Sequence, residues 1–261
     1  MRQKDIQKIR KKKGELTTAQ LVTIIILIVS FVIILFLFFR LDLGRTTNEE
    51  ICHNSVVLKG KTGTTLDCKT NYVCISGGGN CDLPTSETVK VDPKSQTQIM
   101  KALADLMSSC WYEFGEGQID YFGSPGATTN MMCGICSIVE FDGTVQNSQK
   151  NTISYNVFYD YLRDTQKTTS QTYLQYLYST SSVAPFSQGF TLNGYLDNNI
   201  DFGQQYSILT GASREGFLST TFNPFSTSFW PSKATPFPVV ILEKTTENYN
   251  AVGCDEFVTK A

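Results

Sequence analysis

A single uncharged run, residues 16–39, divides this chain into a short basic segment and a long remainder. Its core reads LVTIIILIVSFVIILFLFF over residues 21–39. A bilayer core of about 30 Å needs about 20 helical residues, so the run is long enough to cross it. Buried helices of soluble proteins are shorter and usually carry a polar residue or two. We therefore expect residues 16–40 to form one transmembrane helix that contacts membrane lipid.

Charge on the two sides of the run predicts its orientation. Two acidic residues and seven basic residues precede it, the latter being Arg2, Lys4, Lys8, Arg10, Lys11, Lys12 and Lys13. The positive-inside rule places residues 1–15 in the cytoplasm as a basic tail. Beyond residue 40 there are 22 acidic and 14 basic residues, a net charge of −8, which argues against a nucleic-acid partner. We expect a single-pass plasma-membrane protein with its C-terminal part outside the cytoplasm.

The apolar run differs from a cleaved secretory signal, whose core is shorter and ends in small residues. An uncleaved signal anchor is the leading interpretation. The junction of Lys13-Gly14 with Glu15-Leu16 resembles the prepilin-type signal of archaeal and bacterial type IV pilins, which implies cleavage after Gly14. Ala19 stands at the fifth position after that junction, where pilins usually carry an acidic residue.

All cysteines lie beyond the apolar run, and their number is even. They are Cys52, Cys68, Cys74, Cys81, Cys110, Cys133, Cys136 and Cys254. In an oxidising compartment such a set forms a disulfide framework, which here has 105 connectivities. The first four lie within thirty residues of one another and the last four are spread widely. If the two groups are separate modules, three pairings remain for each.

The motif Cys133-Gly-Ile-Cys136 also fits a membrane-tethered thiol oxidoreductase, in which these two cysteines form the redox pair. Such pairs open a helix after a strand, whereas residues 137–141 read as a strand. A zinc site would need a second close cysteine pair or histidines, and the only histidine is His53. We expect structural disulfides, with no metal and no cofactor.

Composition suggests three parts beyond the run. Residues 41–50 are polar and read as a linker. Residues 51–90 hold the first cysteine group, with strand candidates at 55–58 and 72–75 and a flexible glycine-rich loop at 76–80. Residues 91–261 form the larger body.

The larger body carries one strong helix signal. Asp92 can cap it, Pro93 takes the first helical position, and Gly115 ends it. Six residues share one helical face: Ile99, Leu103, Leu106, Met107, Cys110 and Phe114. Two shorter helices are predicted after possible caps at Ser154 and Ser170.

Strands are predicted at 137–141, 205–209 and 237–242, and a long aromatic and proline-rich loop at 223–231. Because strands and helices do not alternate regularly, we predict an α+β fold for the disulfide-stapled extracytoplasmic domain.

No catalytic residue can be assigned. A Ser-His-Asp or Cys-His arrangement would rest on His53 alone, and no nucleotide-binding or HExxH motif occurs. Glu113 and Glu116 stand beside aromatic residues, as in some sugar-cleaving sites. We interpret the aromatics as helix anchors and the glutamates as solvent-facing, although a carboxylate-based site stays open.

Five segments are similar to uncharacterised, single-pass, cysteine-containing membrane proteins of small symbiotic-type archaea. They are residues 51–56 (ICHNSV), 68–70 (CKT), 109–111 (SCW), 133–138 (CGICSI) and 257–261 (FVTKA). That resemblance implies no activity. The sequence thus favours a non-enzymatic binding, adhesion or envelope-structural protein, whose partner could be a cell-surface protein or a glycan. A pilin-like subunit and a thiol oxidoreductase are the alternatives.

Overall fold

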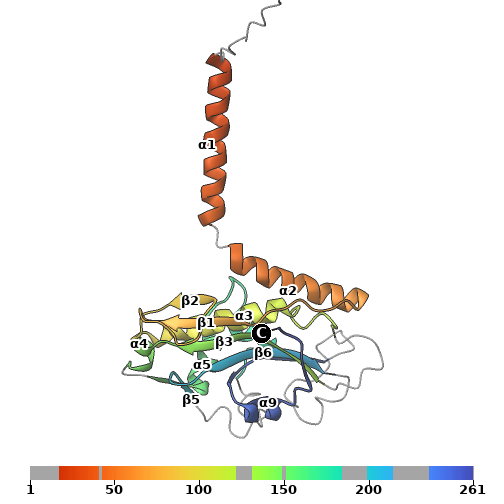
Figure 1. Cartoon of the computed structure of the whole chain (residues 1–261). Coiled ribbons are helices and arrows are strands. Elements are labelled where there is room, and N and C mark those ends of the chain that lie inside the picture. The colour runs from red at the N-terminus through yellow and green to blue at the C-terminus, as the bar shows by residue number, and fades with distance from the viewer. Residues whose placement is uncertain are drawn as a thin grey trace, which may run out of the picture. The chain divides into compact units, whose positions relative to one another are not determined.

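The computed structural model describes residues 18–40, 43–121, 131–148, 151–183, 199–213 and 235–260 (Figure 1). The chain divides into two compact units, residues 1–46 and residues 47–261. The predicted processing site at Gly14 and the predicted loop at 223–231 lie outside the described residues.

The first unit contains helix α1, Thr18–Arg40, which is 23 residues long. The apolar side chains described on it, within residues 20–36, are exposed, as shown by Leu27 at 63% and Phe31 at 61%. Among the described residues, no helix combines the length and apolar character that a membrane crossing requires. The membrane span predicted for residues 16–40 therefore stays a prediction.

Helix α2, Leu43–Thr62, replaces two elements expected from the sequence. The strand predicted at 55–58 was wrong, because these residues belong to a helix, and residues 43–50 of the predicted linker 41–50 are helical as well. Cys52 and Val56 lie one helical turn apart and are 2% and 0% exposed. Burial of this face against the domain outweighs the β-propensity of the valine pair.

The second unit is built on a mixed six-stranded sheet in the order β2-β1-β3-β6-β7, with β8 paired to β3. The strands are β1 (Asn71–Ser76), β2 (Glu87–Lys90), β3 (Met131–Phe141), β6 (Tyr206–Ser213), β7 (Thr235–Glu243) and β8 (Glu256–Phe257). Strands β2, β1 and β3 run parallel, whereas β6 is antiparallel to both β3 and β7. A small second sheet pairs β4 (Thr152–Ser154) with β5 (Asn199–Asp201). The strands predicted at 72–75, 137–141 and 237–242 are confirmed, and the strand predicted at 205–209 begins one residue later, at Tyr206.

Helix α3, Gln96–Glu113, and its C-cap Phe114 present the predicted apolar stripe to the core. All six residues of the stripe are buried. The predicted start was wrong: Ser95 caps the helix by accepting a hydrogen bond from the Gln98 amide. Asp92 instead closes the preceding turn, where its carboxylate accepts from the Lys94 amide at 2.9 Å. Gly115, with φ +78°, follows the helix end as predicted.

Shorter helices complete the domain. They are α4 (Gly143–Gln146), α5 (Tyr155–Asp164), α6 (Tyr173–Tyr178) and α9 (Thr246–Val252). Ser154 caps α5 as predicted, but Thr172 rather than Ser170 caps α6, because Thr172 forms a reciprocal capping box with Gln175. Helix α3 packs against β6 and β7, and α5 and α6 pack against α3. The α+β prediction is confirmed.

Residues 51–90 do not stand apart from the larger body. Their strands β1 and β2 extend the sheet from β3, and their buried side chains belong to the same apolar core as α3 and β7. Burial in a shared core explains how a segment without long apolar runs is held in place.

Candidate functional site at the carboxyl ends of the parallel strands

All eight predicted disulfide cysteines are paired, and each pair stays within its predicted group. The bridges are Cys52–Cys68, Cys74–Cys81, Cys110–Cys136 and Cys133–Cys254. The redox pair proposed for Cys133 and Cys136 is therefore wrong. Both lie on β3, and each is bonded to a separate partner, Cys136 to Cys110 on α3 and Cys133 to Cys254.

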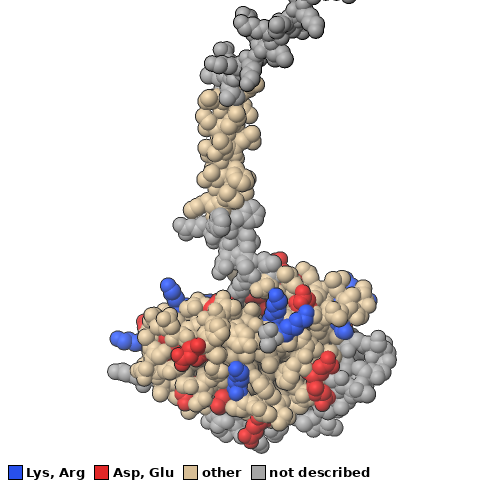
Figure 2. Space-filling view, viewed as in Figure 1, with Lys and Arg blue, Asp and Glu red and all other residues tan. Residues whose placement is uncertain are grey.

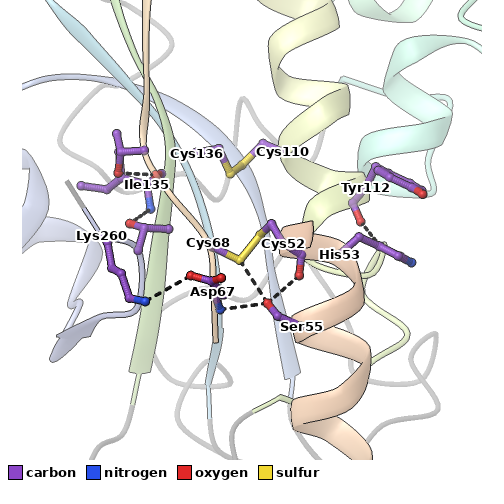
Figure 3. Close-up of a disulfide and its surroundings, with 12 residues drawn as sticks. Cys52, His53, Ser55, Asp67, Cys68, Cys110, Tyr112, Ile135, Cys136 and Lys260 are labelled. Carbon is purple, nitrogen blue, oxygen red and sulfur yellow. Dashed lines mark hydrogen bonds and ion pairs between the residues drawn. A yellow bond between two sulfur atoms is a disulfide. The ribbon is translucent and has the colours of Figure 1, made fainter. Parts of the chain in front are cut away.

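The Cys52–Cys68 bridge fastens α2 to the chain that leads into β1 (Figure 3). Ser55 reinforces it, because its hydroxyl donates to the Cys52 carbonyl at 2.8 Å and accepts from the Asp67 amide at 3.0 Å. Directly after Cys52 in the chain, the His53 ring stacks on Tyr112 with centroids 4.4 Å apart. The Nδ1 atom of His53 also lies 2.6 Å from the Tyr112 carbonyl oxygen. The single histidine thus joins α2 to the end of α3.

The two glutamates considered for a sugar-cleaving pair have different surroundings. Glu113 is 4% exposed, so the expectation that it faces solvent was wrong. Glu116 accepts a hydrogen bond from the Tyr176 hydroxyl at 2.6 Å. Neither lines the hollow described below. Among the described residues, no group of three histidine, cysteine or acidic side chains could hold a metal ion.

The parallel strands bring three chain segments to one edge of the sheet. Ser76 at the end of β1 is in register with Lys90 at the end of β2, and Ile75 is in register with Phe141 at the end of β3. The residues that follow these strands are consequently neighbours. Ligands of open sheets with parallel strands commonly bind at such carboxyl ends.

Asp142 is the centre of this edge and is 1% exposed. It accepts hydrogen bonds from the Ser76 hydroxyl at 2.7 Å, the Gly79 amide at 2.6 Å, the Thr144 hydroxyl at 2.6 Å and the Val145 amide at 2.9 Å. Burial by itself raises the pKa of this carboxyl group. The hydrogen bonds from Thr144, Ser76 and the backbone outweigh that effect and hold the pKa well below its ordinary value.

Several of these contacts involve the glycine-rich segment 76–80, which forms a loop after β1, as predicted. The Cys74–Cys81 bridge closes the loop, and the Glu140 carboxylate accepts from the Leu83 amide at 3.1 Å. Glycine is required at Gly77 because a Cβ atom there would lie 2.5 Å from the Thr144 hydroxyl. The loop is thus tied to the edge by hydrogen bonds and a disulfide.

Beside this edge lies a hollow of about 830 Å³. It is lined by the segment leading into α3 and its first turns, together with α4 and the residues after it: Asp92, Pro93, Lys94, Ser95, Gln96, Thr97, Met100, Thr144, Asn147 and Ser148. Hydroxyl and amide groups predominate, Met100 supplies an apolar surface, and Lys94 and Asp92 supply one charge of each sign. Such a lining suits a small polar ligand held by hydrogen bonds.

Sequence reasoning missed this edge. Asp142-Gly143 gave a turn signal only, and Ser76 and Asp142 are 66 positions apart in the chain. The available hints were two capping residues, Asp142 and Ser95, and a run of three glycines after a strand.

Comparison with protein-family models, curated proteins and solved structures finds no match for this chain. The domain's function must therefore be inferred from its own geometry.

Proposed function

We propose that this chain is a membrane-anchored binding protein whose disulfide-stapled domain works outside the cytoplasm. Support for the anchor comes from α1 and the residues around it. The run 16–39 is uncharged, and the apolar side chains described on α1 are exposed. Figure 2 shows no acidic or basic residue on the part of α1 drawn in tan, whereas the domain carries both. The hydroxyl of Ser30 donates to the Ile26 carbonyl at 2.8 Å, which removes an unpaired polar group from that surface.

The observation that carries the location is the position of the disulfides. All eight cysteines lie on one side of α1, and all are bonded. Disulfides persist in oxidising compartments and are rare in the cytoplasm. Together with the basic residues that precede α1, this supports a location of the domain outside the cytoplasm.

A binding role is supported by the hollow at the carboxyl ends of β1, β2 and β3. Hydrogen bonds hold residues of its walls, since the Thr144 hydroxyl donates to Asp142 and the Ser95 side chain caps α3, so these residues need little ordering when a ligand enters. The lining fits a small polar molecule, or a polar group of a glycan or of another surface protein. The resemblance to single-pass archaeal membrane proteins is consistent with this role and adds no reaction.

Location is tested by protease treatment of intact cells that express the chain with an epitope at each end. We expect loss of the C-terminal epitope and protection of the N-terminal epitope until the cells are lysed. Protection of the C-terminal epitope in intact cells would refute the proposal. Alkylation with a maleimide polymer should shift the denatured protein only after reduction, because all cysteines are bonded.

Binding is tested with the full chain in lipid nanodiscs and a panel of monosaccharides, amino acids and inorganic phosphate. A compound that occupies the hollow raises Tm by mass action. Thr97→Trp, which fills the hollow from an exposed position, should abolish that shift. Lys101→Trp, on the same helix but outside the hollow, should retain it. A shift that survives Thr97→Trp would place the binding site elsewhere.

A pilin-like subunit is the second candidate. One observation favours it: an apolar helix of 23 residues is followed in the chain by an α+β unit. It differs from the first proposal in requiring removal of residues 1–14.

A further inference from the structure

Helix α2 has two apolar side chains on the face that points away from the domain. Successive residues of a helix are rotated by about 100°, so residues seven apart lie almost on one line. Ile51 is 44% exposed and Leu58 is 51% exposed, and they are separated by seven positions. Cys52 and Val56, which fasten α2 to the domain, lie on the other side of the helix and are buried.

This pair is unusual within the domain. Beyond residue 46, the described residues include five large hydrophobic side chains that are exposed: Ile51, Leu58, Tyr112, Val157 and Phe257. Among these five, only Ile51 and Leu58 share a helix. Scattered exposed hydrophobics need no explanation, but an aligned pair on one helix invites one.

Charges border the pair. Glu50 and Lys61 lie on one flank of the line that joins Ile51 to Leu58, about 70–90° from it by helical rotation, whereas Lys59 is seven positions from Cys52 and lies on the side that faces the domain. Lysine stems can extend along apolar surface while the ammonium group reaches water or lipid headgroups. Lys61 can therefore accompany the apolar pair at a membrane interface, where helices combine an apolar face with basic residues.

Chain connectivity selects lipid as the occupant of this face. Residues 41 and 42 alone separate the end of α1 from the start of α2. If α1 crosses the bilayer, α2 therefore begins within about 10 Å of the point where α1 leaves it. Ile51 and Leu58 then lie about 12 Å and 22 Å along α2 from its start, given a rise of 1.5 Å per residue. Both can meet the headgroup region only if α2 lies along the surface.

We propose that the Ile51–Leu58 face of α2 docks on the membrane surface and sets which side of the domain faces the bilayer. This inference rests on the anchor role proposed for α1. The Cys52–Cys68 bridge then holds the docked helix α2 in a fixed orientation relative to the chain that leads into the sheet.

The test uses full-length protein in vesicles of phosphatidylcholine and phosphatidylglycerol, with acyl chains brominated near the headgroup or near their ends. Tryptophan is introduced singly by Ile51→Trp or Leu58→Trp, and emission is compared with that of the unsubstituted protein. Phe31→Trp, in the middle of α1, reports on the anchor. Val157→Trp is the matched control, because Val157 is an exposed hydrophobic on α5 with 49% exposure.

We expect both α2 variants to lose emission in lipid brominated near the headgroup, and Phe31→Trp to lose it in lipid brominated near the chain ends. Val157→Trp should keep its emission in both. If Phe31→Trp is quenched and neither α2 variant is, the docking proposal fails and the anchor stands. If Phe31→Trp is not quenched either, the anchor itself fails. Blue-shifted but unquenched emission from the α2 variants would assign the face to a protein partner and overturn docking on lipid.

Discussion

At the scale of single residues, Asp142 joins segments that are 66 positions apart, because its buried carboxylate accepts the Ser76 hydroxyl and the Gly79 amide. A carboxylate that satisfies four donors is difficult to replace. Any neutral substitute leaves buried hydrogen-bonding groups with weaker partners or with none. The edge of the sheet therefore depends on the charge at this one position.

We predict that Asp142→Asn lowers the free energy of unfolding by about 2–4 kcal/mol at pH 7. The pKa of Asp142 is lower in the folded than in the unfolded protein, so its charge stabilises the fold above an unfolded pKa of about 4. That stabilisation is lost as the pH falls toward the folded-state pKa. The difference between variant and parent should therefore shrink progressively below pH 4, as measured by denaturant unfolding of the full chain.

Asp164→Asn is the control for this prediction. Asp164 pairs with Arg163 at 2.7 Å on the exposed side of α5, where solvent screens the interaction. Its substitution should leave the unfolding curve nearly unchanged. A similar loss in both variants would mean that the buried donors around Asp142 contribute nothing specific.

At the scale of elements, the buried face of a helix could be predicted from the sequence. The choice between two neighbouring caps, or between strand and helix for a short apolar segment, could not. The stripe on α3 was found because apolar spacing reflects the buried face directly. Its start was misplaced because Asp92 and Ser95 are both good caps, and only the tertiary structure decides between them. The residues 55–58 were misread because Val56 and Val57 favour strands, whereas burial of Cys52 and Val56 together requires a helix. The site depends on the register between β1 and β3, which no local pattern records.

The Cys52–Cys68 bridge is expected to control the stability of α2. Replacing both cysteines with serine opens a loop of 16 residues, which should lower the free energy of unfolding by about 3 kcal/mol. The larger effect should be local, because α2 precedes the sheet and is held to it by this bridge. Limited trypsin digestion followed by mass spectrometry should show faster cleavage after Lys59 and Lys61.

Removal of the Cys74–Cys81 bridge provides the comparison. That bridge spans seven positions and closes the glycine-rich loop. Its serine variant should loosen the loop and leave cleavage within α2 at the parental rate. Equal acceleration in the two variants would show general unfolding and contradict a local role for Cys52–Cys68.

At the scale of the whole molecule, the placement of charge and cysteine restricts how the chain can be arranged. The residues before the apolar run are basic, those after residue 40 carry a net charge of −8, and every cysteine lies in the second group. An anchor that keeps its basic segment retains the charge asymmetry that orients it. A filament subunit would lose that segment, since cleavage after Gly14 removes all seven cations that precede α1.

We therefore predict that the mature protein, purified from its membrane, retains residues 1–14. Intact-mass measurement checks this, and N-terminal sequencing of the same sample identifies the first residue. Gly14→Ala should change neither result, because an uncleaved anchor does not use this position. A mature chain that begins at Glu15, together with failure of Gly14→Ala to be processed, would reverse the order of the two proposed functions. It would also favour contact between subunits, rather than contact with lipid, for the exposed apolar surface of α1.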